Sequence, residues 1–171
     1  QTIVVDNKAG ANGTIGVADL ARSAPDGYSF VIVIAAHAAN PSLYAKLPYD
    51  NRNDLAAVSL IGVSPLVAAV NNDAPFKNAK ELVAYAKQNP GKVSFGSAGA
   101  GSAQHLALEM FKLAAKVDVV HVPYKGSGPL LIDLIGGQIQ YSFDTMTAAT
   151  PHVKSGKVTA VAQTRARRAK G

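Results

Sequence analysis

Residues 92–102 read Lys-Val-Ser-Phe-Gly-Ser-Ala-Gly-Ala-Gly-Ser, and an apolar run at helical spacing follows them. Residues 92–97 predict a strand, and the glycines and serines behind it are typical of a tight turn with Ser102 as the N-cap of a helix. We expect that helix to turn one face inward through Leu106, Met110, Leu113 and Val117. The stretch thus predicts a strand–turn–helix unit.

The same alternation continues on both sides of this unit. Upstream, Asn78 and Glu81 have the spacing of a capping box, and Pro90-Gly91 ends the helix that they begin. Downstream we expect a helix opened by Ser127 and Pro129, with further strands at 117–122, 139–143 and 158–162 and a short segment at 148–154. Such alternation favours helices packed on a largely parallel sheet, an α/β fold.

The front of the chain repeats this pattern less completely. We expect a helix after Asn12, and strands at 3–5, 28–35, 55–60 and 65–70. Residues 71–75, Asn-Asn-Asp-Ala-Pro, read as a linker, and we place the boundary between two lobes there.

Composition sets further bounds. A chain of 171 residues that is 48% hydrophobic has material for one sizeable core or two small lobes. It contains no apolar run long enough for a membrane-spanning helix, and no cysteine for disulfides or thiolate metal sites. Because the chain starts directly in the strand-like residues 1–5, we expect that any export signal has already been removed.

The formal charge of +6 comes largely from the C-terminal residues Arg165, Arg167, Arg168 and Lys170. Without them thirteen basic residues face eleven acidic ones, a net of +2. A nucleic-acid face would place basic and aromatic residues together along the fold. The sequence therefore predicts no nucleic-acid partner.

Three turns between a strand and a helix are rich in glycine and serine: 10–13, 96–102 and 125–128. A helix N-terminus offers unpaired N–H groups and the positive end of a dipole, so a carboxylate can dock there without a cationic side chain. Turn geometry alone also requires such residues, and that reading stays open. Neither a P-loop nor a dinucleotide fingerprint is present.

Other polar residues admit competing readings. His105 and Glu109 stand four apart on one helix face, but two ligands are too few for a metal, so we expect no metal site and no cofactor. Ser97 with a histidine is the basis of an alternative, a small hydrolase-like enzyme using Ser97 and His105, although no nucleophile-elbow motif is present. Asp144 ends a strand, where it either contacts a ligand or caps the next helix.

Several phrases together resemble the Bug-type receptors of tripartite tricarboxylate transporters. They are Pro25-Asp-Gly-Tyr28, Asn40-Pro-Ser-Leu-Tyr44, Leu47-Pro-Tyr-Asp50, Gly96-Ser-x-Gly-x-Gly-Ser-x-x-His-Leu-Ala107 and His121-Val-Pro-Tyr-Lys-Gly126. Their order and spacing cover nearly the whole chain. Where the family often reads Asn-Arg-Pro-Gly-Ala-Gly-Gly, residues 7–13 read Asn-Lys-Ala-Gly-Ala-Asn-Gly, which keeps the glycines at 10 and 13.

The resemblance implies a type II periplasmic-binding-protein-like α/β fold, with two lobes on central mixed or parallel sheets that close over a small carboxylated solute. It implies no enzyme, a periplasmic location and a membrane permease as transport partner. Carried over by position, the candidate ligand-binding residues are Ala36, His37, Ser97, Ala98, Gly99, Gly101, Ser102, Tyr124, Lys125 and Asp144.

The resemblance also implies that the first lobe is incomplete. Residues 1–71 would be a partial first lobe, 72–163 the second lobe, and 164–171 a truncated segment returning towards the first. Exposed sheet edges would then favour self-association. We expect a carboxylate-binding transport protein whose solute is a di- or tricarboxylate, an acidic amino acid or an aromatic acid. The alternatives are the hydrolase-like enzyme and a ligand-free interaction module.

Overall fold

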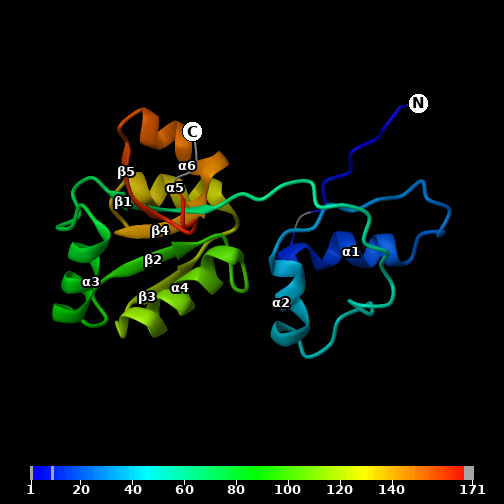
Figure 1. Ribbon diagram of the computed structural model, residues 1–171, viewed down its shortest axis with the longest axis horizontal. Coiled ribbons are helices and arrows are strands. Elements are labelled where there is room, and N and C mark those ends of the chain that lie inside the picture. The colour runs from blue at the N-terminus through cyan, green and yellow to red at the C-terminus, as the bar shows by residue number, and fades with distance from the viewer. Residues whose placement is uncertain (1, 9, 168–171) are drawn as a thin grey trace. The chain divides into compact units, whose positions relative to one another are not determined.

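A computed structural model describes residues 2–8 and 10–167 and divides the chain into two compact units, residues 1–60 and 61–171 (Figure 1). Gln1 of the first expected strand, and Arg168 and Lys170 of the basic terminus, lie outside the described residues. The division precedes the linker at 71–75 where we expected it. Residues 66–71 form a strand that pairs with two strands of the second unit, which places them in that unit.

The second unit is built on one five-stranded sheet. Its strands are β1 (Leu66–Asn71), β2 (Ser94–Ser97), β3 (Val120–Pro123), β4 (Tyr141–Thr145) and β5 (Val158–Gln163). Their order is β3-β2-β4-β1-β5. β2 runs parallel to both β3 and β4, whereas β1 runs antiparallel to β4 and β5. The sheet is therefore mixed, and the expected α/β class is confirmed.

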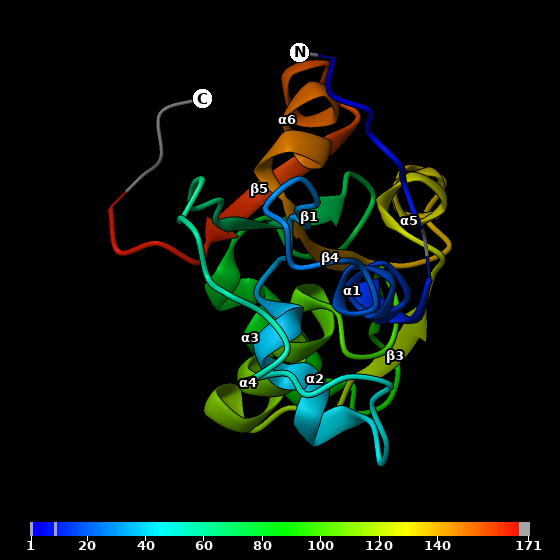
Figure 2. The same ribbon diagram turned by 90° about the vertical axis from the view of Figure 1, so that its right-hand side faces the viewer.

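Four helices cover this sheet, two on each face. α3 (Ala79–Gln88) and α4 (Ala103–Ala115) lie on one face, and α5 (Ser127–Ile135) and α6 (Met146–Lys154) on the other (Figures 1 and 2). The first face buries Leu82 and Leu108 around Phe95, and the second buries Leu130 and Leu134. Successive side chains along a strand point to opposite faces of the sheet, so the strands contribute residues to both cores.

Local signals set the helix starts as expected. The Asn78 side chain accepts a hydrogen bond of 3.0 Å from the Glu81 amide at the start of α3. At α4 the Ser102 hydroxyl accepts one of 3.2 Å from the His105 amide. The inward face of α4 differs from the expected stripe: Leu108 is fully buried and Phe111 packs on the core, whereas Met110 and Leu113 are exposed. The expectation is wrong for these two residues, whereas Val117 of the expected stripe is buried in the core. Because the helix has apolar residues on more than one face, spacing alone could not select the buried ones.

The first unit contains helices but no strand among its described residues. A 3-10 turn (Ala11–Gly13) leads into α1 (Thr14–Ala21), and α2 (Ala36–Leu43) follows. Its core is the small cluster of Val17, Ala18 and Tyr49. The strands expected at 3–5, 28–35 and 55–60 are extended segments without strand pairing.

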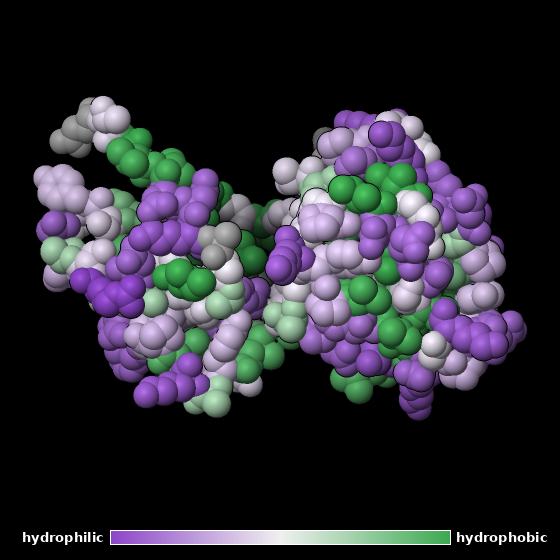
Figure 3. Space-filling view, turned by 180° about the vertical axis from the view of Figure 1, so that it is seen from behind, coloured by the Kyte–Doolittle hydropathy of each residue, from purple (hydrophilic) through white to green (hydrophobic). Residues whose placement is uncertain are grey.

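These unpaired segments leave much apolar surface on the first unit (Figure 3). The exposed apolar residues within them are Ile3, Val4, Val5, Tyr28, Phe30, Ile32, Val33, Ile34, Val58 and Leu60. A strand needs neighbours to satisfy its backbone, and the described residues of this unit do not provide them.

The parallel strands β2, β3 and β4 all end at the same edge of the sheet, which we call the carboxyl edge. β1 begins there, since it is antiparallel to β4, and β5 ends there. Leu66 and Thr164 bind each other at this point: the Thr164 amide donates to the Leu66 carbonyl (3.0 Å) and the Leu66 amide to the Thr164 hydroxyl (3.0 Å). Among the described residues, no helix is long and apolar enough to cross a bilayer.

Candidate functional site

Eight of the ten predicted site residues meet at the carboxyl edge of the second unit. Loop 97–102 follows β2, loop 124–126 follows β3, and Asp144 lies at the end of β4. The first two loops are joined, because the Tyr124 amide donates to the Ser97 carbonyl (2.8 Å) and the Gly126 amide to the Ala98 carbonyl (3.3 Å). Ligands of open α/β sheets bind beyond the carboxyl ends of strands, which makes this edge the candidate site.

Gly96 allows the close packing below these loops. A Cβ atom at this position would lie 2.3 Å from Ile139 Cδ1, 3.2 Å from Leu130 Cγ and 3.3 Å from Tyr124 Cε2. The missing side chain lets the Tyr124 ring and α5 lie against β2. The sequence offered turn geometry or anion binding as the reason for this glycine, and the structure adds close packing against Ile139, Leu130 and Tyr124.

Ser97 is fully buried and its hydroxyl is already engaged. The hydroxyl donates to the Gly99 carbonyl at 3.1 Å. It also lies 2.6 Å from His121 Nε2, and the tautomer of His121 decides which of the two atoms donates. It also accepts from the Gly99 amide at 3.2 Å. Ser97 therefore shapes its own loop and has little capacity left for a solute.

The entrance to α4 is likewise occupied by the protein's own side chains. Ser102 caps the His105 amide, and His105 Nδ1 accepts a hydrogen bond of 3.0 Å from the Gly101 amide. The other ring nitrogen of His105 lies 3.8 Å from Glu109 Oε1. His105 and Glu109 are thus neighbours on α4, and His105 additionally fixes loop 97–102.

The entrance to α5 is the open one at this edge. Its N-cap is Gly126, which has no side-chain hydrogen bond to the helix, and a Cβ at Gly128 would meet nothing within 4 Å. Lys125 is exposed beside it. The N–H groups at an uncapped helix start, the positive end of the helix dipole and a nearby ammonium group together favour a carboxylate at this position.

Asp144 is fully buried between these two helix entrances. Its Oδ1 atom accepts from the Ser127 hydroxyl (2.7 Å), the Thr145 amide (2.7 Å) and Gln104 Nε2 (3.3 Å). Its Oδ2 atom is buried and has no partner among the described residues. The alternative reading of Asp144 as a helix cap is wrong, since Thr145 caps α6 through the Ala148 amide.

The Tyr124 side chain is hydrogen-bonded within the second unit. Its hydroxyl donates to Asp133 Oδ2 on α5 at 2.8 Å. Burial, together with this hydrogen bond, raises the pKa of Tyr124 to about 12. Its phenol therefore stays protonated at physiological pH and acts as a link between loop 124–126 and α5.

Ala36 and His37 lie in the first unit, at the start of α2. Ala36 is fully buried, and the His37 ring stacks on Tyr49 with 6.3 Å between ring centroids. Buried polar atoms without partners in the described structure, His37 Nδ1 and Asn40 Nδ2, also belong to this helix. Asn40 was absent from the predicted set, although it begins the phrase Asn40-Pro-Ser-Leu-Tyr44.

Three further residues organise the site and were missed as site residues: Gln104 and Ser127, which hold Asp144, and His121, which holds Ser97. Each lies within or next to a phrase that carried the family resemblance. Their partners stand 17 to 40 residues away, so spacing along the chain could not reveal the contacts.

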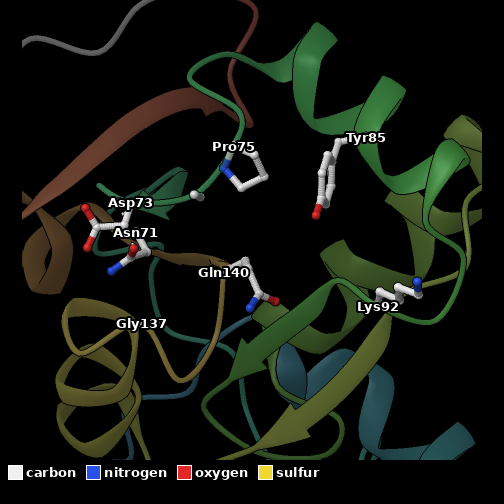
Figure 4. A pocket seen from close by; sticks show the side chains of 8 residues that line it. Asn71, Asp73, Pro75, Tyr85, Lys92, Gly137 and Gln140 are labelled. Carbon is white, nitrogen blue, oxygen red and sulfur yellow. Dashed lines mark hydrogen bonds between the residues drawn. The ribbon is translucent and has the colours of Figure 1, made fainter.

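A cavity of about 370 Å³ lies at the opposite edge of the sheet, lined by Asn71, Asp73, Ala74, Pro75, Tyr85, Lys92, Gly137 and Gln140 (Figure 4). The side-chain amides of Asn71 and Gln140 in its lining are already hydrogen-bonded within the protein. Asn71 Nδ2 donates to the Leu134 and Ile135 carbonyls, and Gln140 Oε1 accepts from the amide and hydroxyl of Ser94. Among the described residues there is also no cluster of three potential metal ligands.

Comparison with known proteins agrees with the resemblance seen in the sequence. The family model described as "Tripartite tricarboxylate transporter family receptor" matches residues 1–170. Protein BugT of Bordetella pertussis is 38% identical over 164 residues, which cover 95% of this chain and 50% of that protein. A UPF0065 protein of Pseudomonas sp. is 35% identical over 96% of this chain and 49% of its own length. The chain thus spans about half the length of these relatives.

Solved structures give the same result. A protein of R. palustris solved with adipate is 34% identical with a TM-score of 0.92, covering 98% of this chain and 56% of that one. The periplasmic binding protein BugD is 40% identical with a TM-score of 0.88, with the same coverage. MatC from Rhodopseudomonas palustris, with bound malate, is 30% identical with a TM-score of 0.80 over 93% of this chain and 54% of that one.

These relatives are receptors and binding proteins rather than enzymes, so they give no support to the hydrolase-like alternative. The fold, the ordered phrases and the match over residues 1–170 lead to one conclusion: the chain belongs to the tripartite tricarboxylate transporter receptor family.

Proposed function

We propose that this chain supplies the carboxylate-binding edge of an extracytoplasmic receptor that delivers a small organic acid to a membrane permease. The observation that carries the proposal is the uncapped start of α5, beside exposed Lys125 and buried Asp144. One carboxylate of the solute docks on the N–H groups of this helix end, and Lys125 adds a favourable charge. A periplasmic location and a transport role are supported by the relatives described as periplasmic binding proteins and transporter receptors.

Asp144 refines the class of solute. A buried carboxylate oxygen without a donor is unfavourable, so Oδ2 attracts an N–H or O–H group. A hydroxy acid or an amino acid brings such a group close to its own carboxylate. Of the expected solute classes, we therefore favour acidic amino acids and hydroxylated dicarboxylates. We propose Ala36 and His37, at the start of α2, as further ligand-binding residues.

The experiment is isothermal titration of the intact protein with carboxylates that differ by one group. We expect malate and aspartate to bind about tenfold or more tightly than succinate, because each adds a donor for Asp144. The variant Asp144→Asn removes this preference. If succinate binds as tightly as malate, Asp144 does not select the solute, and if no carboxylate binds, the proposed function is wrong.

The lysine has a matched control. Lys125→Ala is expected to weaken binding of every carboxylate, by about threefold to tenfold for an exposed charge. Lys154, at the far end of α6 and therefore away from the carboxyl edge, provides Lys154→Ala with the same loss of charge. Equal effects of the two variants would show that net charge, not a site at α5, controls affinity.

A further inference from the structure

The two histidines behind loop 97–102 form a pair that bridges α4 and β3. The rings of His105 and His121 are stacked with 4.1 Å between centroids and 9° between planes. Each ring also holds one end of the loop: His121 contacts the Ser97 hydroxyl at 2.6 Å, and His105 accepts from the Gly101 amide at 3.0 Å. We call His105 and His121 the imidazole pair.

The contact with Gly101 defines the protonation state that this geometry requires. A backbone amide can only donate, so His105 Nδ1 must present a lone pair and carry no proton. A second proton on His105 would place two donors against each other and break the bond to Gly101. The backbone of Gly101 has a positive φ of 77°, so the shape of the loop there is a specific one that this bond helps to hold.

The surroundings disfavour more than one charge in the pair. Burial, and then the charge of His105, lower the pKa of His121. The other titratable groups near the pair are Glu109 and Lys112 of α4, which form an ion pair at 3.2 Å, and Tyr141 of β4, whose pKa is raised by burial and by Glu109. Lys112 already pairs with Glu109, so the Glu109 carboxylate stabilises a protonated histidine less than an unpaired carboxylate would.

We infer that His105 and His121 are positioning residues for loop 97–102, and that the loop keeps its binding shape only while Nδ1 of His105 carries no proton. Protonation of His105 breaks its hydrogen bond with the Gly101 amide, and loop 97–102 changes shape. Because this loop is joined to loop 124–126, the start of α5 then loses affinity for its carboxylate. The receptor then holds its solute near neutral pH and releases it in acid. The effect on affinity rests on the proposed function; the effect on the loop does not.

The decisive measurement follows the amide of Gly101 by NMR in the intact protein, without ligand, between about pH 7.5 and pH 5. We expect its chemical shift and hydrogen exchange to change together with the ring signals of His105. The variant His105→Asn keeps an acceptor where Nδ1 stood but cannot titrate, so Gly101 should stay bonded across the whole range. His152→Asn, on α6, is the matched control and should leave the titration of Gly101 unchanged.

Titration with malate and adipate as probes provides the second readout. We expect affinity to fall by about tenfold or more over the same pH range in the parent protein and to become independent of pH in His105→Asn. His105→Phe keeps a stacked ring without an acceptor and should bind weakly at both pH values. A Gly101 amide that does not respond to pH, or that responds equally in His105→Asn, would overturn the inference. If neither probe binds but Gly101 follows His105, the inference about the loop holds and the proposed function fails.

Discussion

Single atoms decide whether a helix end in this protein is open to a ligand. At α4 the Ser102 hydroxyl and His105 Nδ1 accept hydrogen bonds from amide groups that could otherwise bind an anion, as the turn-geometry reading of this loop allowed. At α5 the residue in the cap position is Gly126, so no side chain competes. The sequence shows the three glycine-rich turns but not which of them leaves its helix start open to a ligand. That depends on which neighbouring side chains hydrogen-bond to the amides in the folded protein.

Gly128 is exposed in the first turn of α5. A methyl group fits there without touching the protein, so Gly128→Ala should leave the melting temperature unchanged or slightly higher. The same methyl group would stand at the mouth of the proposed site. We expect carboxylate affinity to fall about tenfold, or about 1.4 kcal/mol, in isothermal titration. Unchanged affinity would place the solute elsewhere.

The second prediction concerns Tyr124 and alkaline pH. Its folded pKa is raised to about 12 from the ordinary tyrosine value of 10.0, so its protonated form is favoured by folding. The stabilisation is fully present below about pH 10 and is lost as the pH rises towards 12. Tyr124→Phe should therefore unfold at lower urea concentration at pH 8, and the gap to the parent protein should narrow as the pH approaches 12. A constant gap would argue against the hydrogen bond to Asp133.

At the scale of elements, the second unit was largely predictable and the first was not. The capping residues Asn78 and Ser102 and the strands after them were found because their signals are local. β1 was also expected as a strand, within the first lobe, and in the structure it pairs with β4 and β5. The sequence could not show this pairing, because it joins residues 66–71 to residues 141–163. The segments at 3–5, 28–35 and 55–60 have strand-like sequences without described partners, and pairing, not propensity, makes a strand.

Packing between elements yields a prediction at Gly96. An added methyl group would stand 2.3 Å from Ile139 Cδ1, and Ile139 is almost fully buried and has little room to move. We expect Gly96→Ala to lower the free energy of unfolding by about 1–3 kcal/mol, measured by urea denaturation. Gly62→Ala, where a Cβ meets nothing within 4 Å, is the control and should be close to neutral. Comparable losses in both variants would rule out overpacking as the cause.

At the scale of the whole molecule, the two units differ in how well each is stabilised. The second unit has a core on both faces of its sheet, whereas the first buries one small cluster and exposes many apolar side chains (Figure 3). Apolar surface of this kind tends to be covered by other protein. The expected self-association of the chain thus has a physical basis in the exposed apolar side chains of residues 2–8 and 10–60.

This contrast predicts the behaviour of residues 1–171 produced alone. Hydrogen exchange should be slow for the amides of β2 and β4 and fast for the extended segments at 28–35 and 55–60. Analytical ultracentrifugation should show dimers or larger species that dissociate on dilution. A monomer at all concentrations, with protected amides at 28–35, would contradict this expectation.

The reciprocal hydrogen bonds between Leu66 and Thr164 have a practical consequence. They hold the entry and the exit of the five-stranded sheet next to each other, and domains with neighbouring ends tolerate insertion into foreign loops. Residues 64–166 should therefore be transplantable as a cassette, spliced into a surface loop of a fluorescent protein. There the carboxyl edge would lie directly beside the splice points, where an optical reporter of acid binding needs it.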